Sequence, residues 1–181
     1  VDSVQGDFVV NRVHVTDDPQ QVGAVDIVLV AVKAWQVPTI AETMRPLVGP
    51  ETCIVPLQNG VEAPAQLAGA LGASHVVGGV CGLVSYIVAP GHVRHVASAP
   101  FIQAGELDGG PSARLDALGH AFERAGVRFE HVADIQAAMW MKFVFITTWS
   151  GLGALTRAPI GVWRSQPETR RLSEQAAFET L

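Results

Sequence analysis

The sequence predicts an α/β fold with a parallel sheet. The run DIVLVAV at 26–32 is an almost continuous series of apolar residues, most of them β-branched, which is typical of a parallel strand buried on both faces. Helical spacing of apolar residues follows at 35–48. The pattern then repeats, with a strand predicted at TCIVPL (52–57) and a helix at 61–71 that Gly72 can cap. Two consecutive strand-helix units imply parallel strands.

Further strands are predicted on both sides of these units. Residues 7–15 (DFVVNRVHV) are rich in β-branched residues and are followed by the turn signal TDDP, so we expect a strand there. Downstream, turn signals divide three β-rich runs, which predict antiparallel additions to the sheet. A helix and a short strand should follow them. These elements are expected at 75–88, 91–96, 100–105, 111–125 and 127–131.

The last part of the sequence is wholly helical. Asp134 can cap a helix of about twenty residues whose apolar side chains cover most of its circumference, so we expect that helix to be buried. Strand-helix alternation ends at this point. We therefore predict an α/β domain at 1–133, a boundary near 132–135, and the start of a helical domain at 134–181.

Composition narrows the function classes. The net charge is −5 and the 12 Lys and Arg residues are scattered, so no basic patch for nucleic acid is predicted. Cys53 and Cys81 lie apart without CxxC spacing, which indicates neither a disulfide framework nor a zinc site and fits a reducing cytoplasm. Charged residues such as Asp26 and Lys142 interrupt the apolar stretches, so no membrane span is expected. We expect a small molecule as the binding partner, and the sequence leaves it open whether the protein forms a homodimer.

Both ends of the sequence look cut. It begins VDSVQGDFVV, without an initiator Met or signal peptide, and it stops at AAFETL within a predicted helix. We expect it to be the central part of a longer protein.

Candidate ligand-binding residues follow the two predicted parallel strands. Ligands of such sheets bind outside the carboxyl ends of the strands, where Lys33 and the turn Gln58-Asn59-Gly60 are found. A cation and an amide there could hold a ribose, a phosphate or a carboxylate. A solvated lysine and an ordinary Asn-Gly turn are the alternative interpretation.

Lys142 is a second candidate. It lies in the apolar helix between Met141 and Phe143, where a lone cation is unexpected unless it faces a cleft or an anion. An apolar setting would lower its pKa toward the range useful to a general acid. Alternatively, the side chain extends along the surface and keeps its ammonium in water. Ile146 and Ser150 follow on the same helical face.

Two other features are not expected to carry chemistry. The histidines lack acidic partners at ligand spacing, so no metal site is predicted and we expect them on the surface or in turns. They are His14, His75, His92, His95, His120 and His131. The string GLGALT at 151–156 imitates a dinucleotide-binding fingerprint, but it follows a helix and lacks the third glycine.

Three segments together resemble the ketopantoate reductase family. They are VAVKAWQ (30–36), PLQNGVE (56–62) and MWMKFVF (139–145), with further likeness in GHVRHV and in RAPIGVWR at 157–164. The resemblance implies a Rossmann-type N-terminal domain, whose first strand-helix unit and glycine-rich turn would precede this sequence. It also implies a helical C-terminal domain and an active site between the two domains.

The resemblance also implies roles for individual residues. Lys33 and Asn59 match residues that the family places beside the nicotinamide ribose and the substrate, and Lys142 matches the family's general acid. The implied reaction is NADPH-dependent reduction of ketopantoate to pantoate, a step of pantothenate and coenzyme A synthesis. The family commonly has Asn where this sequence has Ile146 and Ser150, residues that would contact the substrate. A related 2-keto acid reductase, or a non-catalytic binder of nucleotide or metabolite, is therefore an alternative.

Overall fold

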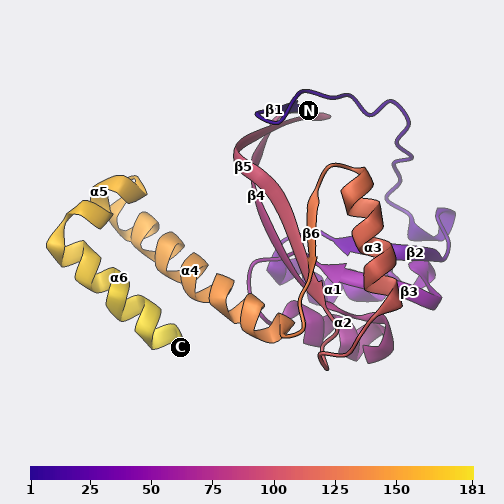
Figure 1. Ribbon diagram of the computed structural model, residues 1–181. Helices are drawn as coiled ribbons and strands as arrows, with labels where there is room; N and C mark the ends of the chain where they lie inside the picture. Colours follow the sequence, from indigo (N-terminus) through magenta and orange to yellow (C-terminus); the bar gives the residue numbers. More distant parts are fainter.

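The computed structural model describes residues 1–181 as an α/β part from which a helical arm projects (Figure 1). The strands are β1 (Asp2–Ser3), β2 (Val25–Val30), β3 (Val48–Pro56), β4 (Gly78–Ala89), β5 (His92–Gly105) and β6 (Arg128–His131). The α-helices are α1 (Val37–Thr43), α2 (Ala63–Leu71), α3 (Ala113–Arg124), α4 (Ile135–Thr156), α5 (Ile160–Ser165) and α6 (Pro167–Thr180). Short 3-10 turns occupy Pro19–Gln21, Ala34–Gln36, Arg45–Leu47 and Ala73–His75.

The two predicted strand-helix units are present. β2 pairs with β3 in parallel, and α1 and α2 follow these strands. α1 is shorter than predicted because Pro46 cannot continue a helix, and the chain passes into a 3-10 turn at Arg45–Leu47. α2 ends as expected at Gly72, whose positive φ of 102° ends the helix while its N–H donates to Ala68 O.

β3 is the buried centre of the α/β part. Ile54 faces a cluster formed with α1 and α2, whereas Cys53 and Val55 face a second cluster that includes Leu115 of α3. Helices thus cover both faces of this strand, whereas the sequence predicts such burial for the run at 26–32. β2 differs from the prediction, because Leu29 is 44% exposed, although Ile27 on the same face packs against the second cluster.

The remaining strands form a mixed sheet. β4 and β5 make a long antiparallel hairpin, and both β1 and β6 pair with β5 in parallel. The turn predicted between the second and third β-rich runs is wrong, because β5 continues through it with a bulge at 97–100, where Ala97 has a φ of 75°. The bridge between Ile54 and Val76 joins this sheet to β3.

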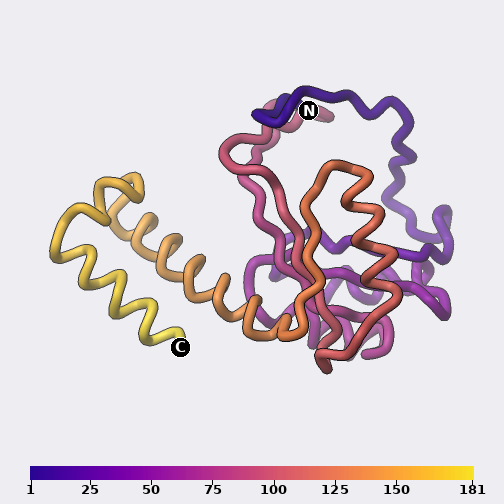
Figure 2. Tube along the Cα trace, in the orientation of Figure 1, coloured from indigo at the N-terminus to yellow at the C-terminus, as the bar shows by residue number.

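The strand predicted at 7–15 is also wrong. Val9 and Val15 are 79% and 82% exposed, and no backbone hydrogen bond ties residues 9–15 to the rest of the chain. A strand requires a partner for its backbone groups, and this segment instead arches from the tip of the hairpin to β2 (Figure 2). β1, which does find a partner in β5, covers two residues that the sequence did not single out.

α4 begins where the sequence predicts. The Asp134 carboxylate accepts a hydrogen bond from Ala137 N at 2.9 Å and caps the helix. The expected full burial is wrong: Met141 is 75% exposed, because α4 packs on the hairpin through its first turns and on α6 further along (Figure 1). None of the helices combines the length and hydropathy that a membrane crossing requires.

A polar cluster fixes α3 to the end of β5. Arg114 donates from Nε to Glu106 Oε1 at 2.7 Å and from an Nη to Glu106 Oε2 at 2.5 Å, while Ser112 Oγ donates to Glu106 at 2.5 Å. The hydrogen bonds from Arg114 are the main reason that the pKa of Glu106 lies below its usual value. Ser112 also caps α3 through Leu115 N.

Glu106→Gln should lower the free energy of unfolding by about 1.5–3 kcal/mol at neutral pH, because charge-assisted hydrogen bonds are lost. A lowered folded-state pKa means that the carboxylate contributes stability above the pKa of the unfolded chain, near 4.5, and loses that contribution as the pH falls through the lower folded value. The difference between the two proteins should therefore shrink on acidification. Urea unfolding between neutral pH and about pH 4 measures it.

Glu42→Gln is the matched control, since Glu42 also pairs with an arginine, Arg45, but on the exposed surface. It should change the unfolding midpoint little. Equal losses from the two variants would contradict the stabilising role given to Glu106.

Candidate functional site

A cavity of about 710 Å³ lies between α4 and the β4–β5 hairpin, and we call it the Lys142 cavity. One wall is the face of α4 that carries Ala138, Lys142 and Ile146, and the other is formed by β4 and β5. The turn after β3 contributes Asn59. The lining also includes Val80, Cys81, Gly82, Leu83, Val84, Ser98, Phe101, Gln103, Val132, Asp134, Ala137, Met141 and Phe145.

Lys142 is held against the β4 wall. Its Nζ donates a hydrogen bond to the backbone carbonyl of Cys81 at 2.5 Å, and the side chain is half-buried. Burial lowers the pKa of Lys142, because the charged form loses solvation. The side chain therefore reaches the cavity wall, in contrast to a lysine extended into water. An ammonium has three donors, so two further donors can serve a ligand.

Asn59 enters the cavity from the carboxyl end of β3. The turn that carries it is held by Gln58, whose buried Nε2 donates to Val30 O at 2.8 Å and to Val32 O at 3.2 Å. Gly60 completes the turn with a φ of 115°, which a residue with a side chain adopts only with strain. Asn59 itself is exposed, and its amide makes no hydrogen bond within the chain. Gln58 thus positions the turn, and Asn59 is free to bind.

Two predicted site residues lie outside the cavity. Lys33 is exposed after β2, where its backbone N–H donates a hydrogen bond to Gln36 Oε1 at 3.0 Å, and it does not line the cavity. Ser150 is exposed two turns beyond Lys142 and does not line it either. The structure therefore brings together Asn59, Lys142 and Ile146, and leaves Lys33 and Ser150 apart from them.

Sequence reasoning missed Phe101. It lies opposite Gly82 in the hairpin, and its ring covers that glycine so closely that an added Cβ at Gly82 would lie 2.0 Å from Phe101 Cε1. The register that makes this pair depends on the bulge at 97–100, which the sequence signals only as a turn. A glycine within an apolar strand was the one available hint of such a close approach.

The prediction that the histidines lie on the surface or in turns is wrong for His95. This residue is 6% exposed, with Nδ1 at 2.9 Å from Ser3 Oγ and Nε2 at 3.0 Å from Ser98 O. It therefore links β1 to the bulge of β5. His92 lies 2.9 Å from Asp2 at the surface. No group of three or more His, Cys, Asp or Glu residues is placed to hold a metal ion.

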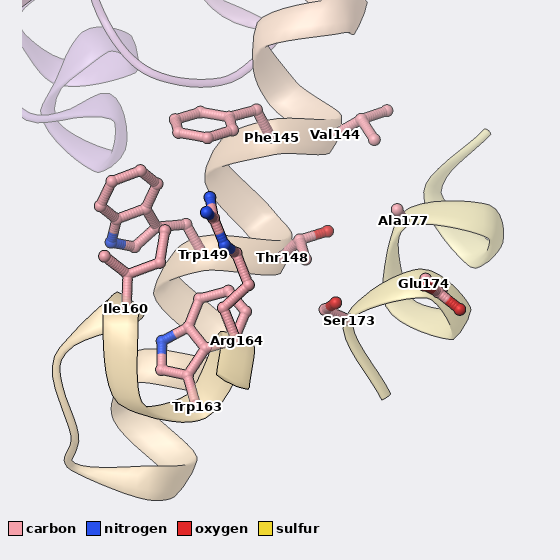
Figure 3. Close-up of a pocket in the computed structure, with 10 residues that line it drawn as sticks. All are labelled: Val144, Phe145, Thr148, Trp149, Ile160, Trp163, Arg164, Ser173, Glu174 and Ala177. Atoms are coloured by element: carbon pink, nitrogen blue, oxygen red, sulfur yellow. The ribbon is translucent and has the colours of Figure 1, made fainter. Parts of the chain in front are cut away.

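A second cavity, of about 430 Å³, lies among α4, α5 and α6 (Figure 3). Trp149 and Trp163 line it beside Arg164, and Phe145 borders both cavities. Trp163 Nε1 and Thr148 Oγ1 are buried without a hydrogen-bond partner. None of the residues predicted for the site lines this second cavity.

Two family models match the chain. The model described as "Ketopantoate reductase PanE/ApbA" matches residues 1–109, and "Ketopantoate reductase PanE/ApbA C terminal" matches residues 134–181.

Individual relatives agree with these models. The 2-dehydropantoate 2-reductase of Nostoc sp. is 29% identical, over 99% of this chain and 57% of that protein. The crystal structure of 2-dehydropantoate 2-reductase from Geobacter metallireducens GS-15 matches with a TM-score of 0.92 and 33% identity, over 98% of this chain and 59% of that one. The PanE/ApbA family ketopantoate reductase from Ralstonia eutropha JMP134 matches with a TM-score of 0.86 and 26% identity, over 99% of this chain and 57% of that one. The chain thus spans somewhat more than half the length of these relatives.

The fold is accordingly that of a Rossmann-type N-terminal domain followed by a helical C-terminal domain. Because the first family model alone covers more than half of its residues, the chain belongs to the ketopantoate reductase family.

Proposed function

We propose that this protein reduces the ketone of a small 2-keto acid with NADPH as the hydride source, and that ketopantoate (2-dehydropantoate) is the first substrate to test. The observation that carries the proposal is Lys142: a half-buried ammonium, anchored at Cys81 O, in a cavity that it shares with the free amide of Asn59. The names of the relatives support the same reaction at about 30% identity.

The residues present fit a nicotinamide cofactor. Lys33 and Asn59 follow the carboxyl ends of the parallel strands β2 and β3, which is where Rossmann-type sheets bind dinucleotides. Both side chains are exposed, and the Asn59 amide can pair with ribose hydroxyls or with the substrate. When bound, NADPH would supply the hydride to the keto carbon.

Lys142 would supply the proton. As the ketone is reduced, negative charge develops on its oxygen, and a positioned ammonium stabilises that charge more strongly in the transition state than in the ground state. Transfer of a proton from Nζ then completes the alcohol. The lowered pKa of Lys142 favours this transfer, because a weaker hold on the proton brings the donor closer to the working pH.

The proposal has two further parts. It divides the chain into a dinucleotide-binding domain at 1–133 and the start of a substrate and dimerisation domain at 134–181. It also assigns the protein to the cytoplasm, where Cys53 and Cys81, both free thiols in the structure, would stay reduced.

The test is oxidation of NADPH by the full-length protein in the presence of ketopantoate, with NADH measured in parallel. We expect keto acid-dependent oxidation with a preference for NADPH. Oxidation with an equal or greater preference for NADH would overturn the cofactor assignment alone. Tight nucleotide binding without turnover of any 2-keto acid would favour the non-catalytic alternative.

A further inference from the structure

The Lys142 cavity holds few free hydrogen-bonding groups. Besides Lys142, its polar side chains are Asn59, Ser98, Gln103 and Asp134. Gln103 Nε2 already donates to Glu130 at 3.0 Å, and the Asp134 carboxylate caps α4 through Ala137 N. Lys142, Asn59 and the hydroxyl of Ser98 keep free capacity, and so do the oxygen of the Gln103 amide and the second oxygen of the Asp134 carboxylate.

A 2-keto acid would use the donors among these groups. Its carboxylate and its ketone present three oxygen atoms, and each loses water on entering the cavity. Ketopantoate carries a fourth oxygen, the hydroxyl at the end of its side chain. The side chains that flank Lys142 on α4, Ala138 and Ile146, offer this hydroxyl no hydrogen bond.

The surfaces on both sides of Lys142 are apolar. On α4, Ala138 lies one turn before Lys142 and Ile146 one turn after it. Phe145 stands beside them, and its ring packs edge-on against Trp149 with centroids 4.8 Å apart. Apolar side chains thus continue on either side of the proposed proton donor.

The facing wall is apolar as well. Phe101 and Val84 of the hairpin line the cavity opposite α4. Phe101 can lie there because Gly82, its cross-strand partner, has no side chain to displace the ring. A substrate side chain bound next to Lys142 would therefore contact carbon on both sides.

We propose, as a deepening of the 2-keto acid reduction proposed above, that this site prefers 2-keto acids with a wholly apolar, branched side chain over ketopantoate, and that Ile146 is the specificity-determining residue. Ile146 supplies apolar contact one helical turn from Lys142. Phe101 forms the opposite wall of the same subsite.

The size of the preference can be bounded. An apolar pocket rejects a substrate that merely adds a hydroxyl by no more than about 10²-fold. We therefore expect kcat/KM to favour the apolar acid by about 10- to 100-fold.

The test compares ketopantoate with 3,3-dimethyl-2-oxobutanoate, which has the same carbon skeleton and lacks only the hydroxyl. In the full-length protein, kcat/KM should be about 10- to 100-fold higher for the deoxy acid. Ile146→Asn should lower this ratio at least tenfold, because the new amide can pair with the hydroxyl. Ile146→Leu is the matched variant and should keep the ratio near its original value. The dissociation constant of NADPH, measured for each protein, shows whether the cofactor site is intact.

The outcomes separate the two proposals. If neither acid is reduced, the proposed function fails and this inference fails with it. If ketopantoate is reduced as well as its deoxy analogue or better, or if Ile146→Asn leaves the ratio unchanged, the preference or the role of Ile146 is overturned while the reductase proposal stands.

Discussion

Lys142→Ala should lower kcat of the full-length protein by roughly 10² to 10⁴, the range expected when a positioned general acid is removed. The dissociation constant of NADPH should change little, because Lys142 contacts the β4 backbone in the cavity and the cofactor is assigned to Lys33 and Asn59. Steady-state kinetics and a binding titration under the same conditions measure both quantities. A near-normal kcat in the alanine variant would reduce Lys142 to a structural lysine.

Lys142→Arg distinguishes proton transfer from simple charge. A guanidinium keeps the positive charge, but its pKa is too high for ready proton donation and its donors have a different geometry, so kcat should recover poorly. The pH profile gives a second readout. The rate should fall as the pH rises through the lowered pKa of Lys142, because a deprotonated lysine cannot act as the acid. This limb should be absent in Lys142→Arg. An arginine variant with full activity would leave electrostatic stabilisation as the only role of position 142.

Gly79→Ala should destabilise the protein by about 3 kcal/mol, the upper part of the usual range for overpacking. A Cβ on Gly79 would lie 2.3 Å from the carbonyl oxygen of Pro56, so β4 would have to move away from the end of β3. That contact is where the hairpin meets the central strand, and neither backbone can yield without disturbing a buried cluster. The midpoint of urea unfolding measures the loss.

Gly69→Ala provides the matched control. Gly69 lies within α2 with no atom near the position of its missing Cβ, and alanine is the better helix former by about 1 kcal/mol. This variant should therefore be slightly more stable than the original protein. Similar destabilisation by both substitutions would show that close packing at Gly79 is not the cause.

The elements best predicted from the sequence were those whose local pattern agrees with their surroundings. TCIVPL was predicted as a strand and forms β3, while Asp134 and Gly72 mark helix ends as expected. Such signals act within a few residues of the chain, so their outcome depends little on distant segments.

The failures share a different cause. Residues 7–15 have strand-like composition, but no neighbouring strand receives their hydrogen bonds. β5 runs through an Ala-Ser-Ala-Pro sequence because β4 pairs with it on either side of the bulge. The exposure of Met141 depends on which surfaces reach α4, and helical periodicity carries no such information.

In the candidate site, too, the features that depend on local sequence were predicted and those that depend on distant segments were not. Lys142 was singled out because a cation interrupts an apolar helix, and Asn59 because it follows a strand. Their common cavity requires the hairpin to stand beside α4, and the contribution of Phe101 requires the register set by a bulge. Neither feature can be read from spacing along the chain.

The hydrogen bond between Lys142 and Cys81 has a consequence for how mutations act on this site. Its acceptor is a main-chain oxygen, which every amino acid at position 81 would present equally. This hydrogen bond therefore does not depend on which amino acid occupies position 81, although Cys81 also lines the cavity. Substitutions that bend β4 are the ones that would displace the acceptor, and these include changes at glycines of that strand such as Gly79. Mutational sensitivity around Lys142 should thus follow the path of the strand more closely than the identity of the residue that it contacts.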